Sequence, residues 1–349
     1  MNSKYLNILR EMEKDREQGT ESSKDSHLLI IDGLNTFIRV FSAVPALNDD
    51  GQHIGGVTGF LRSVAANIRQ LKPTRCVIVF DGKGGSKRRK AIYPNYKANR
   101  ANKTAFNRYQ EFASLEDESA SMKKQFGRLA QYLNCLPITT ISVDNVEADD
   151  IMAYIANELY TEKENRATIV STDRDFLQLV NNRISVWSPI KKKLYTPSLM
   201  KEEFGFSPEN YLLYRTFIGD KSDNIPGIKG VGPKSLIKHF PIICEDREIT
   251  VDEIVEYADN VDKKYKVHET VLQNKETLQL NYDLMQLKEV NIHGGAKMLT
   301  LDKVKGKVDR TNTYEFKKMF MADKMYTVIK DLDSWLHTSF NALNAYTSL

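Results

Sequence analysis

Aspartates stand at the ends of three apolar runs in this 349-residue chain. They are Asp32, Asp81, Asp173 and Asp175. A single aspartate at such a position is usually the N-cap of the next helix, so a structural role is available for each. Repeated placement is less easily accidental. Because the ligand crevice of an α/β sheet lies at the carboxyl ends of its strands, we expect these carboxylates to meet there.

Two further segments bring acids together. In Val146–Asp150 (VEADD), Glu147 and Asp150 are three residues apart on one helical face, with Asp149 beside them. Acids in a first helical turn also favour the helix dipole, which is the structural alternative. The segment Gly219–Asn224 (GDKSDN) adds Asp220 and Asp223 before a turn rich in Gly and Pro. Acids this close repel each other unless positive charge lies between them.

If these segments converge, nine carboxylates share one crevice: Asp32, Asp81, Glu147, Asp149, Asp150, Asp173, Asp175, Asp220 and Asp223. Their repulsion would protonate several of them at neutral pH unless divalent cations are bound. The three cysteines show no CxxC spacing and the six histidines are scattered, so the ligands must be oxygens, which select Mg²⁺ or Mn²⁺. Two such ions about 4 Å apart activate a water and stabilise a leaving oxygen. The acids therefore predict metal-assisted hydrolysis of a phosphate ester.

The elements that must position these acids alternate between strand and helix. Amphipathic stretches at residues 60–71 and 151–159 repeat their apolar side chains at helical spacing. Alternation of this kind predicts a doubly wound α/β fold with a mostly parallel sheet flanked by helices. Five short β-rich runs are the predicted strands: His27–Asp32, Arg75–Asp81, Ile138–Val143, Ala167–Thr172 and Arg183–Trp187.

The chain divides by composition. From about Pro208 the texture becomes helical and predicts a smaller all-α lobe that closes over the sheet. After about residue 290 we expect a loop that contains Gly294, Gly295 and Gly306 and then one helix with an aromatic stripe; such a stripe is more often core packing than a docking face. The stripe consists of Tyr314, Phe316, Phe320, Met321 and Trp335. The expected regions are a charged arm (1–26), an α/β core (27–205), a helical lobe (206–290) and a C-terminal helical extension (291–349).

Charge is distributed unevenly. The net charge is +4, yet Gly82–Gln110 holds nine Lys and Arg and no acid, so the rest of the chain is mildly acidic. A solvated loop is the alternative, but Tyr93 and Tyr96 interleave with the basic residues, as suits a phosphate backbone with unstacked bases. Nucleic acid is the leading partner. No apolar run is long enough for a membrane span and no secretory signal is evident, so we expect a protein of the cell interior.

A glycine-rich segment supports the same partner. Gly227–Lys234 (GIKGVGPK) has the spacing of a helix-hairpin-helix turn, with Gly227, Gly230, Gly232 and Lys234 as its key positions. Glycines let the backbone approach a phosphate, and successive amides form an anion-binding nest. A plain turn is the alternative, but the preceding GDKSDN stretch favours binding to the DNA backbone.

Five segments, in order and spacing, resemble the five-prime nuclease and flap endonuclease family. The family includes the five-prime nuclease domain of bacterial DNA polymerase I and stand-alone phage enzymes. The resemblance runs from about residue 27 to 290 and implies a PIN-like, resolvase-like core, a helix-hairpin-helix lobe and a helical arch at about 82–122. The segments are Leu29–Ala43 (LIIDGLNTFIRVFSA), Phe80–Arg100 (FDGKGGSKRRKAIYPNYKANR), Val146–Asp150 (VEADD), Ser171–Leu179 (STDRDFLQL) and Gly219–Lys234 (GDKSDNIPGIKGVGPK).

The resemblance also implies roles for individual residues. The nine acids would be the ligands of two metal ions: Asp32, Asp81, Glu147, Asp149 and Asp150 around one, and Asp173, Asp175, Asp220 and Asp223 around or near the other. Lys97 and Arg100 would act on the scissile phosphate, with Asp32 and Asp149 as catalytic acids of the metal site. The DNA contacts would come from the hairpin, with a potassium ion, and from Arg39, Lys83, Lys87, Arg88, Arg89 and Tyr96.

The implied function is a magnesium-dependent, structure-specific five-prime nuclease that cuts five-prime ends and flaps. We expect it to act on DNA and RNA–DNA hybrids, to remove RNA primers from lagging-strand fragments and to accept Mn²⁺. We also expect a monomer in the cytoplasm of a bacterium or phage-infected cell, a contact with single-strand DNA-binding protein, and, since no polymerase region follows, a stand-alone enzyme of phage type. The alternatives are a non-catalytic helix-hairpin-helix protein and another magnesium phosphohydrolase, such as a phosphatase with an aspartyl nucleophile.

Overall fold

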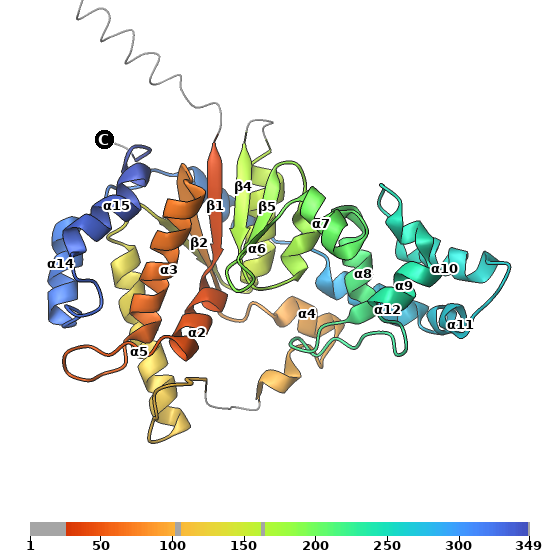
Figure 1. Ribbon diagram of the computed structural model, residues 1–349, viewed down its shortest axis with the longest axis horizontal. Coiled ribbons are helices and arrows are strands. Elements are labelled where there is room, and N and C mark those ends of the chain that lie inside the picture. Colours follow the sequence, from red (N-terminus) through yellow and green to blue (C-terminus); the bar gives the residue numbers. More distant parts are fainter. Residues whose placement is uncertain (1–25, 102–105, 162–164, 348–349) are drawn as a thin grey trace, which may run out of the picture.

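The computed structural model describes residues 26–101, 106–161 and 165–347. Its centre is a six-stranded sheet in the order β3-β2-β1-β4-β5-β6 (Figure 1). The first five strands are parallel to their neighbours, and β6 pairs antiparallel with β5. The strands are β1 (His27–Asp32), β2 (Arg75–Asp81), β3 (Thr139–Val143), β4 (Arg166–Val170), β5 (Ile184–Ser188) and β6 (Lys193–Tyr195). The α/β class and the five predicted strands are confirmed, with ends shifted by up to two residues; β6 is not predicted.

The central strand β1 is buried on both faces. Leu28 and Ile30 belong to the hydrophobic core on one side of the sheet, and Leu29 and Ile31 belong to the core on the other side. Successive side chains of a strand point to opposite faces, so a continuous apolar run is what a doubly covered strand requires. The strand therefore ends at Asp32 between two protecting layers of helices.

Helices cover both faces of the sheet. One face carries α2 (Gly33–Ala43), α3 (Gly55–Leu71) and α5 (Leu115–Leu133). The other carries α6 (Ala148–Tyr154), which continues as a π-helical turn to Leu159. The two helices predicted from apolar spacing are confirmed as α3 and α6. The order of the strands reverses between β1 and β4, which is where open α/β sheets form their ligand crevice.

The lobe is all-α, as predicted, and extends to one side of the sheet (Figure 1). Helix α13 (Gly294–Lys305) then returns to the sheet and contacts β3. Among the described residues, no helix is long and apolar enough to cross a membrane. Helix α7 (Pro197–Phe204) follows β6 at the end of the α/β core, and the helices of the lobe are α8 (Tyr211–Ile218), α9 (Pro233–His239), α10 (Val251–Asn260), α11 (Lys266–Gln273) and α12 (Lys275–Met285).

The segment between β2 and α5 contains α4 (Lys87–Ile92) and the short 3₁₀ turn η1 (Ala98–Ala101). The predicted arch is thus helical only in these pieces before residue 102, and residues 102–105 lie outside the described part. Beyond them the chain returns to the body. The amides of Phe106 and Asn107 donate to the Glu118 carboxylate, and the Asn107 side chain donates to the carbonyl of Phe41 at 2.6 Å.

The C-terminal region corrects two predictions. Residues 294–305, expected as a loop around Gly294 and Gly295, form α13, and in place of the single helix expected after that loop there are two, α14 (Thr313–Ala322) and α15 (Leu332–Asn344). Asp331 ends the break by accepting the Ser334 amide as the N-cap of α15. Phe316 and Phe320 are buried in the core beside α3 and α5 and Trp335 packs against that core, whereas Tyr314 and Met321 are exposed, so only part of the aromatic stripe is core packing. The charged arm predicted for residues 1–26 lies outside the described residues except for Ser26.

Candidate active site

The carboxyl end of β1 presents Asp32 where the strand order reverses. One carboxylate oxygen caps α2 by accepting a hydrogen bond from the Asn35 amide at 3.0 Å. The other accepts the hydroxyl of Ser171, just beyond the neighbouring strand β4, at 3.0 Å. Asp32 is therefore a helix cap and also faces the crevice, so its structural and functional interpretations do not compete.

Backbone donors hold the next two acids in a similar way. An oxygen of Asp81 accepts the amide of Ala148 at 2.9 Å, which joins the end of β2 to the first turn of α6. An oxygen of Asp173 accepts the amide of Asp175 at 2.8 Å, and the Asp173 amide donates to Ser171 at 3.0 Å. These carboxylates are positioned by neutral groups and not by a cationic side chain.

Four acids lack a cation of their own. Burial raises the pKa of Asp32 to about 7, with the charges of Asp173 and Asp81 adding to the shift. Burial, and then the charges of Asp173 and Asp32, raise the pKa of Asp149 well above its usual value. Burial also raises the pKa of Asp173. Within the described residues, no Lys or Arg forms an ion pair with Asp32, Asp81, Asp149 or Asp173, which we call the unpaired acids.

A buried arginine neutralises part of the VEADD segment. Arg89, on α4, forms ion pairs with Glu147 and with Asp150, whose two oxygens lie 2.7 and 3.0 Å from the guanidinium. Although burial acts in the opposite direction, Arg89 and Lys97 hold the pKa of Glu147 below its usual value. The chain itself therefore supplies positive charge to two of the three neighbouring acids, Glu147 and Asp150, whereas Asp149 stays among the unpaired acids.

A second buried arginine serves the opposite side of the crevice. Arg215, on α8, donates to Asp175 at 2.7 Å and to Asp220 at 2.6 Å. Burial opposes ionisation of Asp220, but hydrogen bonds from Ser222 and the charge of Arg215 hold its pKa below the usual value. Burial and the charge of Asp173 still raise the pKa of Asp175 to about 7. Arg215 thus ties the end of β4 to the lobe.

The third cationic group comes from Tyr96–Arg100 (YKANR), which we call the YKxxR element. Lys97 reaches Glu147 at 2.5 Å, and Arg100 donates to Asp223 at 2.6 Å. The hydroxyl of Tyr96 donates to Asp223 at 3.0 Å. Together these contacts define the paired acids: Glu147, Asp150, Asp175, Asp220 and Asp223.

The nine predicted ligands therefore line one edge of the sheet in two electrostatic states. Across residues 26–101, 106–161 and 165–347, no group of three or more His, Cys, Asp or Glu side chains is set to hold a metal ion. The charges of the unpaired acids nevertheless act on one another, since each of Asp32 and Asp149 is affected by Asp173. The donor set consists of hard oxygens in a partly buried crevice, which fits Mg²⁺ or Mn²⁺. No Cys or His belongs to it.

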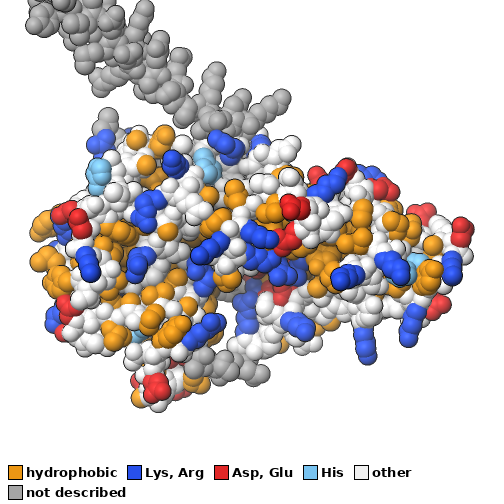
Figure 2. All heavy atoms as spheres, in the orientation of Figure 1, with side chains coloured by type: hydrophobic (Ala, Val, Ile, Leu, Met, Phe, Trp, Pro, Cys, Tyr) orange, Lys and Arg blue, Asp and Glu red, His pale blue; other side chains and the backbone are white. Residues whose placement is uncertain are grey.

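The structure corrects two of the predicted DNA contacts. The side chain of Arg89 is only 4% exposed and that of Tyr96 is also buried, so neither can reach a phosphate or a base in this conformation. Lys83 and Lys87 are exposed, and Lys87 contacts Asn145 at 2.8 Å. Figure 2 shows Lys and Arg side chains gathered where the body meets the lobe.

Arg39 and Arg88 take intermediate positions. Arg39 is largely buried; one guanidinium nitrogen donates to Ser63 at 3.4 Å and its Nε has no hydrogen-bond partner. Arg88 is 30% exposed and approaches Asp150 only at 3.5 Å.

The predicted hairpin is an exposed turn before α9. Gly230 adopts a φ of +84°, which favours glycine, and Pro233 occupies the first turn of α9. Gly227, Gly230 and Lys234 are exposed, and Gly232 is partly exposed. The turn is anchored by the Ile228 amide, which donates to the carbonyl of Phe217 at 2.8 Å. The backbone is therefore accessible, as binding of a phosphate would require.

Two contributing residues are missed by the sequence analysis. Arg215 is the single charged residue in the apolar helix Tyr211–Ile218, and a lone arginine on a buried helix indicates a buried acidic partner. Ser171 bridges Asp32 and Asp173, but a serine at a strand end has no distinctive sequence signal.

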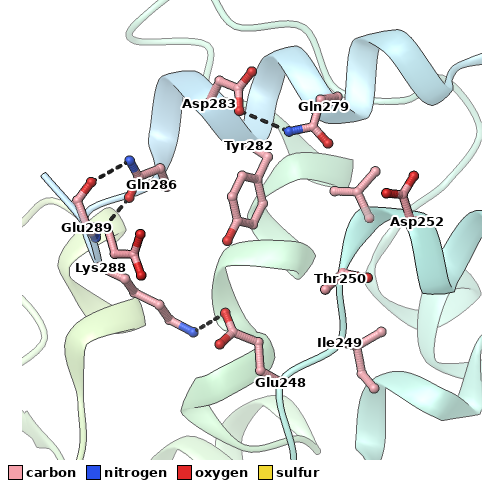
Figure 3. Close-up of a pocket in the computed structure, with 11 residues that line it drawn as sticks. Glu248, Ile249, Thr250, Asp252, Gln279, Tyr282, Asp283, Gln286, Lys288 and Glu289 are labelled. Atoms are coloured by element: carbon pink, nitrogen blue, oxygen red, sulfur yellow. Dashed lines mark hydrogen bonds and ion pairs between the residues drawn. The ribbon is translucent and has the colours of Figure 1, made fainter. Parts of the chain in front are cut away.

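A pocket of about 450 Å³ lies elsewhere, in the lobe between α10 and α12 (Figure 3). Its rim is closed by the ion pair between Lys288 and Glu248 at 2.7 Å, and the ring of Tyr282 points into it. It contains none of the predicted site residues. The candidate site is therefore the acid-lined edge of the sheet and not this pocket.

Comparison with protein families matches two regions of the chain. Residues 27–205 match the model of the 5'-3' exonuclease N-terminal resolvase-like domain, and residues 206–307 match that of the 5'-3' exonuclease C-terminal SAM fold. A 5'-3' exonuclease of Aquifex aeolicus is 29% identical over 320 residues, which cover 88% of this chain and 95% of that protein. DNA polymerase I of Rhizobium leguminosarum is 30% identical over 275 residues, and there the chain spans only 25% of the relative's length.

Solved structures of the phage T5 enzyme share the fold. T5 5'-exonuclease with bound zinc has a TM-score of 0.58 at 21% identity, with 85% of this chain and 98% of that one covered. The T5 D15 flap endonuclease in complex with DNA and metal ions has a TM-score of 0.57 at 20% identity, with 87% and 100% covered. At this level of identity the likeness shows a common fold.

Proposed function

The chain belongs to the 5'-3' exonuclease family and is a nuclease; on this premise we propose that it hydrolyses phosphodiesters at five-prime ends and flaps of DNA with two divalent metal ions. The observation that carries the proposal is the set of unpaired acids at the carboxyl ends of β1, β2 and β4 and in the first turn of α6. Asp32 is buried, Asp149 and Asp173 are half-buried and Asp81 is exposed; none has an ion-pair partner among the described residues, and the basic side chains Lys97 and Arg100 lie nearby.

The unpaired acids are the residues that would hold the ions most directly. Asp32, Asp81, Asp149 and Asp173 supply only oxygen donors, and their mutual repulsion favours a bound cation. When bound, Mg²⁺ or Mn²⁺ activates the attacking water and stabilises the leaving oxygen. The paired acids surround this set, and Arg89, Arg215, Lys97 and Arg100 already neutralise part of their charge.

Lys97 and Arg100 are the proposed partners of the scissile phosphate. Lys97 is 15% exposed and lies against Glu147, while Arg100 is largely exposed and pairs with Asp223. An anionic substrate at this edge would compete for both cations. A donor aimed at the charge that develops during reaction contributes about 3–4 kcal/mol in well-studied enzymes.

The hairpin would hold the duplex. Its accessible glycines and Lys234 can contact phosphates, and a potassium ion bound to the turn would add positive charge. The five-prime strand would then pass beneath the basic arch segment, where exposed Lys83 and Lys87 attract its phosphates. In this proposal the hairpin contributes mainly to DNA affinity, and the YKxxR element contributes mainly to the rate of cleavage.

The proposed biological substrates include RNA–DNA hybrids, so that the enzyme removes RNA primers during lagging-strand replication in the cytoplasm. The relatives support this proposal, since DNA polymerase I and the T5 flap endonuclease are among the proteins the chain resembles. A monomer suffices, because all proposed residues come from one chain.

A replication partner such as single-strand DNA-binding protein has a candidate surface on α14. Tyr314 and Met321 are 73% and 58% exposed, whereas Phe316 on the same helix is buried. Replacing Tyr314 and Met321 by Ser should abolish binding of that partner without lowering the melting temperature. Binding that persists in this double variant would exclude α14 as the contact.

The decisive test is a cleavage assay on labelled flap, nicked and RNA–DNA hybrid substrates, with Mg²⁺, with Mn²⁺ and with a chelator. We expect cleavage at the branch point that depends on the metal and is lost in Asp149→Asn. p-Nitrophenyl phosphate serves as a control for a general phosphohydrolase. DNA binding without cleavage in every metal condition, or cleavage that Asp149→Asn leaves intact, would contradict the two-metal proposal.

A further inference from the structure

One arginine joins three separate elements of the molecule. The guanidinium of Arg89 reaches from α4 to Glu147 and Asp150 at the start of α6. Its Nε donates to the backbone carbonyl of Leu284, near the end of α12, at 2.8 Å. The arch segment, the sheet domain and the lobe therefore meet at a single side chain.

This cluster is complete without a metal ion. Arg89 and Lys97 carry two positive charges, and Glu147 and Asp150 carry two negative ones. The longer contacts of Arg88 with Asp150 at 3.5 Å and of Lys97 with Asp223 at 3.7 Å add one charge of each sign, so the charges stay matched. The geometry of Asp150 is bidentate, with 2.7 and 3.0 Å contacts to Arg89. A buried ion pair is tolerated only when its charges are matched and hydrogen-bonded, and both conditions hold here.

The same cluster sets the position of Lys97. Arg89 and Lys97 lie on one short segment and both contact Glu147. The chain between them turns sharply, since Lys97 has a φ of +57° and its amide donates to the carbonyl of Asp223 at 2.9 Å. A non-glycine residue in this conformation needs support from its surroundings. Arg89 supplies that support from α4, and the Asp223 loop supplies it from the lobe.

We infer that Arg89 is a positioning residue of the reaction: through Glu147 and Asp150 it fixes the segment Lys87–Arg100 and so places Lys97 beside the unpaired acids. The inference rests on the nuclease function proposed above and deepens it. It also assigns Asp150 to this ion-pair network and not to the metal ions. The consequence is that the near side of the arch is ordered before DNA arrives.

The chain offers a matched control. Lys90 is the next residue on α4, carries the same charge and is exposed. Lys90→Met removes one positive charge from the same helix, as Arg89→Met does, without touching the buried cluster. A difference between the two variants therefore reports the buried contacts and not the general attraction of DNA to a basic helix.

The experiment compares Arg89→Met, Arg89→Lys and Lys90→Met in the full chain. Hydrogen exchange without DNA, Mn²⁺ affinity by calorimetry and the single-turnover rate on flap DNA are measured for each. We expect Arg89→Met to lose exchange protection across residues 87–100 and to slow cleavage by about 10–100-fold, with Mn²⁺ affinity within about threefold of wild type. Arg89→Lys keeps the positive charge and should recover part of the protection and of the rate. Recovery should be incomplete, because an ammonium group cannot make the bidentate contact. Lys90→Met should retain the protection.

Two results would overturn the inference. One is unchanged protection and rate in Arg89→Met; the other is a Mn²⁺ affinity that falls in parallel with the rate. Asp150→Asn provides the second test if Arg89→Met does not fold, because it keeps the side chain but removes the charge. The Asp150→Asn variant should retain its affinity for Mn²⁺. A loss of Mn²⁺ affinity in this variant would show that Asp150 is a metal ligand and would refute the assignment. If wild type cleaves no flap, the proposed function fails while the exchange measurement still judges the role of Arg89.

Discussion

The unpaired and the paired acids lie along the same edge of the sheet, yet the protein treats them differently. Asp32 and Asp149 have raised pKa values because they are buried near other carboxylates. Glu147 and Asp220 are also removed from water, but neighbouring cations and hydrogen bonds lower their pKa values. The chain thus supplies counter-charges for one group and leaves the other to be neutralised from outside. The proximity of many acids therefore does not by itself show which of them are metal ligands.

The difference follows from where the side chains originate. The unpaired acids end strands or begin α6, so their nearest donors are backbone amides such as those of Asn35 and Ala148. The paired acids face α4 and α8, which bring Arg89 and Arg215 into the crevice from outside the sheet. Neutral amides position a carboxylate without neutralising its charge, whereas an arginine neutralises that charge.

The largest expected effect is at an unpaired acid. Asp173→Asn should reduce the single-turnover rate on flap DNA by about a thousandfold or more, because a proposed metal ligand is lost. The same change should raise the melting temperature in the presence of a chelator, because it removes a buried charge that other acids repel. Activity and melting curves on one preparation test both parts. A lower melting temperature in the chelator would show that Asp173 already has a compensating partner.

Lys97 lies between the two groups and should give the next largest effect. Lys97→Ala should lower the single-turnover rate by about 10²–10³-fold and change DNA affinity far less, because its interaction with the phosphate strengthens in the transition state. The variant also leaves Glu147 with Arg89 as its remaining cation. Binding to uncleaved flap DNA, measured with Ca²⁺ in place of Mg²⁺, separates affinity from rate. A loss of affinity equal to the loss of rate would assign Lys97 to ground-state binding.

Asp220 is the matched test among the paired acids. Asp220→Asn should slow cleavage by only about tenfold, since the acid is already engaged by Arg215. In the chelator it should lower the melting temperature, the opposite sign to Asp173→Asn, because it leaves the buried Arg215 with Asp175 alone. The melting temperatures of the two variants, compared side by side, decide whether the division into two groups is real. Equal shifts of the same sign in the two melting temperatures would show that the two groups of acids do not differ.

The sequence predicts the strands that carry the site better than the side-chain contacts inside the site. The runs before Asp32 and Asp81 are apolar and β-branched, so their strands and the shared edge follow from pattern alone. The pairing of Arg89 does not, because a basic residue in a basic run is ordinarily a solvated one. Its burial depends on α4 folding back between α6 and the Leu284 carbonyl, a contact between residues about 195 positions apart.

The C-terminal region shows the same limit. Aromatic spacing predicts the burial of Phe316 and Phe320, and both are buried. It does not reveal the break between α14 and α15. That break is stabilised by Asp323, which accepts hydrogen bonds from Arg128 and Tyr132 of α5, both at 2.7 Å. Local pattern predicts which residues are buried, but contacts between distant elements decide where a helix stops.

The smallest expected effect lies farthest from the acids. Lys234→Ala on the hairpin should weaken DNA binding a few fold and reduce the salt slope of binding by about one, as for the loss of a single phosphate contact. The single-turnover rate at saturating enzyme should stay close to wild type, because Lys234 is exposed and contacts neither group of acids. Binding measured at several salt concentrations provides the slope. A reduced rate at saturating enzyme with an unchanged salt slope would place Lys234 in the catalytic step. The lobe could then no longer be described as binding DNA without taking part in cleavage.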